Sequence, residues 1–231
     1  MNGPARLQLR VDTIGTTAPA TTLVLLPAAA ARAVDFEREG FLTALESHRV
    51  SVRVVRSEVP VDIYAADGIV ALLRNEVLEP LRADGGRVWV AGISLGGMTA
   101  LACAEAHRDL IDGVYAIAPW PGPRPLWNGI PAAGGLVAWA ASQRRPFDDE
   151  RRVWRWLGQG AVGCEVVIGH GRDDRFREGQ QLMGAALDPA RRFVVDGAHD
   201  WPAWRALWHR FLALYAPRWR ADAPGERAVS G

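Results

Sequence analysis

The chain contains no lysine, and its only cysteines are Cys103 and Cys164. Without lysine it can form neither a Gly-Lys-Ser/Thr phosphate loop nor a Schiff base. The cysteines are far apart in the sequence and lack Cys-x-x-Cys spacing, so they suggest neither a zinc site nor a disulfide framework. We therefore expect no bound metal, and such low cysteine usage fits a reducing, cytoplasmic location.

The chain also lacks an excess of charge of either sign, because its 27 basic and 26 acidic residues leave a net charge of +1. A nearly neutral chain has no long-range field to attract nucleic acid, so we expect no nucleic-acid partner. The longest apolar stretches, residues 23–31 and 130–142, are too short or too interrupted to cross a bilayer. Residues 1–13 are too polar for a signal peptide. The sequence leaves open whether the protein is a homo-oligomer.

The pattern of apolar residues predicts strands that alternate with helices. Several strands are continuously apolar, which is typical of a parallel sheet with helices on both faces. We therefore predict an α/β fold with a doubly wound, mostly parallel sheet, in one domain over residues 1–216. The expected strands are 6–12, 22–26, 50–56, 87–92, 113–118, 164–169 and 192–195, and the expected helices are 33–47, 62–82, 95–107, 177–187 and 201–215.

Two segments depart from this alternation. Residues 120–163 form a connection several times longer than an ordinary crossover, and they include half of the ten tryptophans. We expect this insertion to form a helical cap, with Trp120, Trp127 and Trp139 as walls of a substrate pocket or as core residues. For Trp154 and Trp156, filling the core is an equally good interpretation. Residues 217–231, rich in Pro, Arg and Gly, are expected to form a flexible tail.

The segment "GISLGG", residues 92–97, places Ser94 between glycines at a predicted strand-to-helix junction. It fits the G-x-S-x-G nucleophile elbow, in which the serine adopts a strained backbone conformation. The neighbouring glycines allow the strand and the helix to approach without a Cβ clash. We predict that Ser94 is a catalytic nucleophile.

A serine nucleophile needs a histidine base and a carboxylate that orients it, in the chain order Ser, acid, His for this type of elbow. His199, in the loop "GAHDW" after the last predicted strand, fits the base. The loop "GHGRDDRF" offers two acids, of which Asp174 is preferred because it lies three residues after Gly171, although Asp173 stays open. His170 either lines the pocket or hydrogen-bonds a neighbouring loop.

The tetrahedral intermediate also needs backbone N–H donors. The amide of Leu95 is one candidate, because it opens a helix and has no carbonyl partner within it. The second donor is expected after the strand at 22–26, where Ala28 is the first choice and Ala29, which could also contact the substrate, is the second. Packing at a helix N-terminus is the alternative role for these alanines.

Together, "GISLGG", "GHGRDDRF" and "GAHDWPAW" resemble the α/β-hydrolase superfamily over nearly the whole chain. The resemblance implies an eight-stranded sheet, shortened here at its N-terminal edge, a helical cap after the sixth strand, and Ser-Asp-His catalysis without a cofactor. The small size and aromatic cap are similar to those of carboxylesterases and thioesterases acting on modest acyl groups.

We therefore expect a hydrolase that cleaves a small-molecule ester or thioester with a mainly apolar acyl group. An acyltransferase or perhydrolase could use the same three residues, with a nucleophile other than water. A ligand-binding protein that keeps the fold without turnover is the alternative from another class. A complete set of Ser94, Asp174 and His199 argues against this last alternative.

Overall fold

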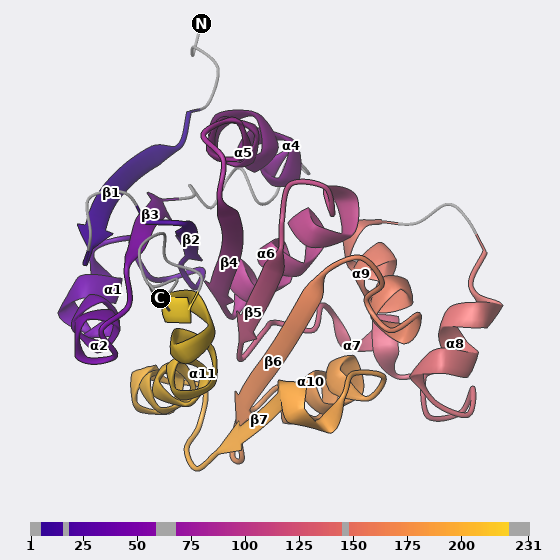
Figure 1. The fold of residues 1–231 in the computed structure, drawn as a ribbon. Coiled ribbons are helices and arrows are strands. Elements are labelled where there is room, and N and C mark those ends of the chain that lie inside the picture. The colour runs from indigo at the N-terminus through magenta and orange to yellow at the C-terminus, as the bar shows by residue number, and fades with distance from the viewer. Residues whose placement is uncertain (1–5, 16–18, 59–67, 145–147, 222–231) are drawn as a thin grey trace, which may run out of the picture.

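The computed structural model describes residues 6–15, 19–58, 68–144 and 148–221. These residues form a seven-stranded sheet in the order β1-β3-β2-β4-β5-β6-β7 (Figure 1). Only β1 is antiparallel to its neighbour, and all other pairs are parallel, which confirms the predicted α/β class. The strands are β1 (Gln8–Ile14), β2 (Thr21–Leu26), β3 (Val52–Glu58), β4 (Arg87–Ile93), β5 (Gly113–Ile117), β6 (Glu165–Gly171) and β7 (Arg192–Val195).

Helices cover both faces of the sheet (Figure 1). One face carries α4 (Ile69–Leu73), the π-helical turn η1 (Arg74–Leu78), α5 (Glu79–Ala83), α6 (Leu95–Ala106), α9 (Asp149–Gly158) and α10 (Arg177–Gly184). The other face carries α1 (Asp35–Arg38), α2 (Phe41–Ser47) and α11 (Trp201–Ala221). Two short helices, α7 (Arg124–Trp127) and α8 (Leu136–Ser142), follow β5, and the 3-10 turn η2 (Pro189–Arg191) precedes β7.

The double covering explains the apolar strand sequences. In β4, Val88 and Val90 pack into the core on the α6 side, whereas Trp89, Ala91 and Ile93 pack into the core on the α11 side. Successive side chains of a strand point to opposite faces, so a strand buried on both sides must be apolar at every position.

The strand order places a switch point between β2 and β4. From β2 the chain moves to β3 on one side, and it then returns to β4 on the other side of β2. Loops leave such a point in opposite directions, so a crevice forms at the carboxyl ends of the two strands. Ala28 follows β2 and Ser94 follows β4, so the predicted nucleophile and the predicted oxyanion donor both lie at this edge.

Two predicted helices differ in the structure. The helix expected over 33–47 is divided into α1 and α2, because Gly40 adopts a φ of +78°, a left-handed conformation that interrupts a helix. The helix expected over 62–82 is observed from Ile69 to Ala83 with a π-helical turn in the middle. Residues 62–67 lie outside the described residues.

The boundary of the predicted tail was wrong for residues 217–221. These residues continue α11 to Ala221, although Pro217 lies inside the helix. The helix continues because Trp219 is buried, with its ring centroid 5.8 Å from that of Trp89 on the sheet. Burial of this indole stabilises the end of the helix and offsets the lost hydrogen bond and the steric clash that an interior proline causes. Residues 222–231 lie outside the described residues.

The insertion between β5 and β6 contains α7, α8 and α9 (Figure 1). Helix α9 packs against α6, and α8 packs against α9. Trp154 and Trp156 are both buried in α9, which confirms the core role for these two residues. Within the part of the chain that the structure describes, no helix is both long enough and apolar enough to span a bilayer.

Candidate active site

Ser94 lies at the sharp turn between β4 and α6. Its φ of 54° and ψ of −112° fall in a region that non-glycine residues rarely occupy, which confirms the predicted strain. A Cβ on Gly96 would lie 2.5 Å from the carbonyl oxygen of Pro27, and a Cβ on Gly92 would lie 2.7 Å from the amide nitrogen of Gly97. Glycine is therefore required at both positions for the turn to close.

Three of the predicted residues form one hydrogen-bonded chain. The Ser94 hydroxyl lies 2.9 Å from Nε2 of His199, and Nδ1 of His199 lies 2.7 Å from Oδ2 of Asp174. An ionised carboxylate can only accept, so Nδ1 carries the proton and Nε2 is left to accept from the hydroxyl. The backbone holds the serine in place, because its amide donates to the carbonyl of Ile117 and its own carbonyl accepts from the amide of Trp120, both at 2.9 Å.

Asp174, and not Asp173, is the acid beside the histidine. Asp174 is buried, whereas the side chain of Asp173 is exposed. Burial raises the pKa of Asp174, but hydrogen bonds from His199, the Phe176 amide and Gln180 outweigh it, so the pKa is lowered overall. The carboxylate is therefore ionised at neutral pH.

Backbone contacts hold the acid loop against the histidine loop. The amide of Asp173 donates to the carbonyl of Gly197 at 2.9 Å, and the amide of Arg172 donates to the carbonyl of Val195 at 2.8 Å. A Cβ on Gly171 would lie 2.7 Å from the carbonyl oxygen of Ala198. These contacts fix the separation between the two loops, and with it the distance between the carboxylate and the imidazole.

Aromatic rings enclose the imidazole on two sides. The ring of Phe176 meets His199 edge-on with centroids 5.0 Å apart, and the ring of Trp204 does the same at 5.3 Å. These contacts restrict rotation of the imidazole, whose side chain is only 9% exposed, so the ring stays directed at Ser94.

The two predicted oxyanion donors lie on adjoining segments. Leu95 is the first residue of α6, where a backbone N–H has no partner within the helix. Ala28 is half-buried directly after β2, and Ala29 is exposed. The close approach of Pro27 to Gly96 brings the loop that carries both alanines against the first turn of α6.

Comparison with protein families agrees with this geometry. Residues 71–213, well over half of the chain, match the model of the Esterase family, described as "Putative esterase". The chain belongs to this family. It is an ester-cleaving hydrolase. Among curated proteins there is no significant match to the chain.

Solved structures share the fold of this esterase at low sequence identity. Est1E from Butyrivibrio proteoclasticus is 14% identical with a TM-score of 0.60, over 93% of this chain and 95% of that one. A carboxylesterase of Nitrososphaera gargenis is 18% identical with a TM-score of 0.59, over 96% and 99% of the two chains. The fluorophosphonate-binding serine hydrolase FphF of Staphylococcus aureus is 12% identical with a TM-score of 0.58, over 92% and 99%.

The three tryptophans expected at the substrate pocket have different environments in the esterase. Trp120 is half-buried, and its backbone contact to Ser94 places it beside the elbow. Trp127 is buried and lines a cavity of about 420 Å³ between α7 and α10. Trp139 is buried in the core cluster on the α6 side of the sheet. Of the three, only Trp120 is shown in contact with the elbow.

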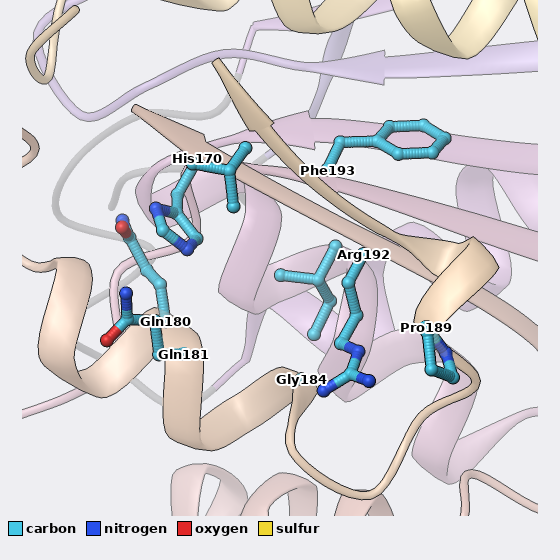
Figure 2. A pocket seen from close by; sticks show the side chains of 9 residues that line it. His170, Gln180, Gln181, Gly184, Pro189, Arg192 and Phe193 are labelled. Atoms are coloured by element: carbon cyan, nitrogen blue, oxygen red, sulfur yellow. The ribbon is translucent and has the colours of Figure 1, made fainter. Parts of the chain in front are cut away.

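A second cavity, of about 330 Å³, lies between α10 and the strands β6 and β7 (Figure 2). His170 lines this cavity and is buried, and its Nδ1 donates at 2.9 Å to the carbonyl of Gly171, the next residue of β6, and not to a neighbouring loop. Among the residues described, the linings of the two cavities do not include Ser94 or His199. Over the described ranges, no group of three or more His, Cys, Asp or Glu side chains could hold a metal ion.

Sequence reasoning missed Gln180, which donates from Nε2 to Oδ2 of Asp174 at 3.2 Å. A signal was present, because Gln180 shares a face of α10 with the buried residues Met183 and Gly184, at i, i+3 and i+4 spacing. A polar side chain on a buried face needs a hydrogen-bond partner, so this spacing indicates one for Gln180. The packing of Phe176 and Trp204 against His199 was also missed, and no short motif encodes it.

Proposed function

We propose that the esterase cleaves a carboxylic ester or thioester through an acyl-enzyme on Ser94. The observation that carries this proposal is the continuous set of hydrogen bonds from the Ser94 hydroxyl through His199 to Asp174. The same three groups, in the same contacts, activate a serine in hydrolases of unrelated folds, so the geometry and not the family supports the mechanism.

In the first step, Nε2 of His199 accepts the hydroxyl proton while Oγ of Ser94 attacks the substrate carbonyl carbon. The carboxylate of Asp174 holds the proton on Nδ1 and stabilises the imidazolium that forms. The tetrahedral intermediate then collapses, and the imidazolium returns its proton to the departing alcohol or thiol. Water attacks the acyl-serine by the same route, with His199 again as base, and the free acid leaves.

For the oxyanion we propose the amides of Leu95 and Ala28, with Ala29 as the alternative to Ala28. Leu95 directly follows the nucleophile, so its N–H lies beside any carbonyl that Ser94 attacks. The contact between Pro27 and Gly96 supports Ala28, because it brings that loop to the elbow. Donors fixed by the backbone need no reorganisation as the negative charge develops.

For the substrate we propose a small to medium, mainly apolar acyl group. Aromatic side chains lie beside the reacting groups, because the rings of Phe176 and Trp204 pack edge-on against His199. Such surfaces favour apolar acyl chains, because burying apolar area is favourable. A carboxylesterase from Nitrososphaera gargenis shares the fold, which is consistent with a carboxylic ester as the substrate.

The test is hydrolysis of p-nitrophenyl acetate, butyrate and octanoate by the wild type and the Ser94→Ala variant. We expect kcat to fall by about 10⁶-fold in the variant, as when the nucleophile of a serine hydrolase is removed. A fluorophosphonate probe should label the wild type and not Ser94→Ala, whereas Ser47→Ala, which removes an exposed hydroxyl on α2, should be labelled normally. Undiminished hydrolysis by Ser94→Ala would disprove the acyl-enzyme proposal.

A further inference from the structure

Gln180 ties the acid loop to the segment beside the nucleophile. It lies in α10, and only 1% of its surface is exposed. Its Nε2 donates to Oδ2 of Asp174 at 3.2 Å and to the carbonyl oxygen of Pro119 at 3.1 Å. The next residue, Trp120, donates its amide to the carbonyl of Ser94. One side-chain amide therefore connects the backbone at the elbow with the carboxylate that orients the base.

The oxygen that Gln180 contacts is the one that His199 uses. Oδ2 of Asp174 accepts from Nδ1 of His199 at 2.7 Å as well as from Gln180, and Oδ1 accepts from the amide of Phe176 at 2.8 Å. Donors on both oxygens fix the rotation of the carboxyl group. The donor from Gln180 also withdraws charge from Oδ2, which weakens the stabilisation of the imidazolium and keeps His199 able to give its proton up.

The orientation of the amide is set by these contacts. Asp174 and the Pro119 carbonyl are both acceptors, so the NH₂ group must face them, and a flipped amide would place oxygen against oxygen. Oε1 of Gln180 is then buried without a hydrogen-bond partner among the described residues. An unpaired buried acceptor costs folding free energy that an apolar side chain would avoid. Packing alone therefore does not explain an amide at this position.

Gln180 also lines the cavity between α10, β6 and β7 (Figure 2). Gln180, Gln181 and His170 all line this cavity, whereas Asp174, which Gln180 contacts, does not. Truncating Gln180 would remove the wall between them, so water or a small solute could reach Oδ2.

We propose that Gln180 is a positioning residue of the hydrolytic reaction: its amide fixes Oδ2 of Asp174 against His199 and closes that oxygen off from the adjoining cavity. This inference rests on the acyl-enzyme mechanism proposed above. Gln180 acts through Asp174, so it should influence the chemical step more than substrate binding.

The test compares Gln180→Ala with Gln181→Ala, in the full-length protein and with p-nitrophenyl butyrate. Gln181 is the matched control, because it lines the same cavity but is exposed. We expect kcat of Gln180→Ala to fall about 10- to 100-fold, the usual effect of losing a hydrogen bond to a charged group, with little change in KM. The acidic limb of the kcat/KM profile should move to higher pH, because a carboxylate with one donor fewer stabilises the imidazolium more. Gln181→Ala should behave as the wild type.

Two further measurements exclude a merely structural role. Acetamide has the size and the donors of the missing group, so it should restore part of kcat in Gln180→Ala and have no effect on Gln181→Ala. Gln180→Glu keeps the shape of the side chain, but it can donate only while protonated, so its kcat relative to wild type should fall as the pH rises. The Gln180→Glu variant still tests the positioning role if Gln180→Ala folds poorly.

The outcomes separate this inference from the mechanism on which it rests. If Ser94→Ala is inactive but both Gln180 variants keep the wild-type kcat and pH profile, only the role of Gln180 is disproved. The same holds if activity falls only in proportion to the folded fraction, with an unchanged pH profile and no rescue by acetamide. If Ser94→Ala remains active, both proposals fail.

Discussion

The loops that follow β4, β6 and β7 hold polar side chains by backbone geometry, whereas the insertion between β5 and β6 holds its tryptophans by burial. At the elbow, glycines at 92 and 96 allow the backbone to approach itself closely and set Ser94 at a φ of 54°. In the insertion, Trp154 is fully buried, and its Nε1 donates to the carbonyl of Pro121 at 2.9 Å. The first region positions hydrogen-bonding groups, and the second fills volume.

This difference teaches where changes should affect chemistry and where they should affect stability. Hydrogen bonds between Ser94, His199 and Asp174 depend on distances of 2.7 to 2.9 Å, so a shift of one ångström in a loop disrupts them. Burial of an indole tolerates small shifts but not loss of the ring. Replacements at the strand ends should therefore reduce kcat, and replacements inside the insertion should reduce the free energy of unfolding.

After the loss of Ser94 itself, the largest expected effect is on catalysis, from Asp174→Asn. The amide would favour the wrong imidazole tautomer, so we expect kcat for p-nitrophenyl esters to fall by about 10⁴-fold with little change in the far-UV circular dichroism. Asp173→Asn is the control, because it changes the neighbouring, exposed carboxylate in the same loop, and its kcat should stay within a few-fold of wild type. The opposite ranking of the two variants would assign the role to Asp173.

The next effect is on stability, from Trp154→Ala in α9. Removing a fully buried indole and its hydrogen bond should lower the free energy of unfolding by about 3–5 kcal/mol, measured by urea denaturation. In the same insertion, Val137→Ala on α8 should change it by less than about 0.5 kcal/mol, because this side chain is 64% exposed. If Trp154→Ala unfolded like the wild type but lost kcat, the contrast between the two regions would be wrong.

The elbow and its partners could be predicted because short sequence motifs encode backbone geometry at strand ends. Glycines around Ser94 permit only one kind of turn, and the parallel sheet brings loops distant in sequence to the same edge. The choice between Asp173 and Asp174 was harder, since it depends on which side chain turns inward. The structure shows that it is Asp174.

Contacts made only in the folded chain could not be predicted from motifs. Gln180 has no motif of its own, and its importance depends on a partner six residues away in sequence and on Pro119, 61 residues away. The end of α11 is a different case, because Leu212, Tyr215, Ala216 and Trp219 continue a helical pattern across Pro217. The Pro, Arg and Gly content of residues 217–231 predicted a tail, although the helical spacing of these four residues favoured a longer helix.

A smaller effect is expected from Gly96→Ala, which tests how tightly the elbow is packed. The new Cβ would lie 2.5 Å from the carbonyl oxygen of Pro27, so the loop after β2 must move. We expect a loss of about 1–3 kcal/mol in the free energy of unfolding, together with a lower kcat because the proposed donor Ala28 shifts. Gly129→Ala, in the insertion, is the control, because nothing lies within 4 Å of its added Cβ. Equal stability of the two variants would show that the elbow can relax.

The smallest effect is a pH dependence of stability that originates at Asp174. Its pKa is lowered in the folded protein, so the ionised form stabilises the fold above the ordinary value of 3.8, and this stabilisation is lost as the pH falls through the folded pKa. The difference in free energy of unfolding between the wild type and Asp174→Asn should therefore be largest near neutral pH and should narrow on acidification. Urea denaturation at pH 7, 5, 4 and 3 measures it, with Asp173→Asn as the control for loss of a charge from the same loop. A difference that widened as the pH fell would mean that burial outweighs the hydrogen bonds from His199, Phe176 and Gln180, and that the carboxylate is not held ionised by them.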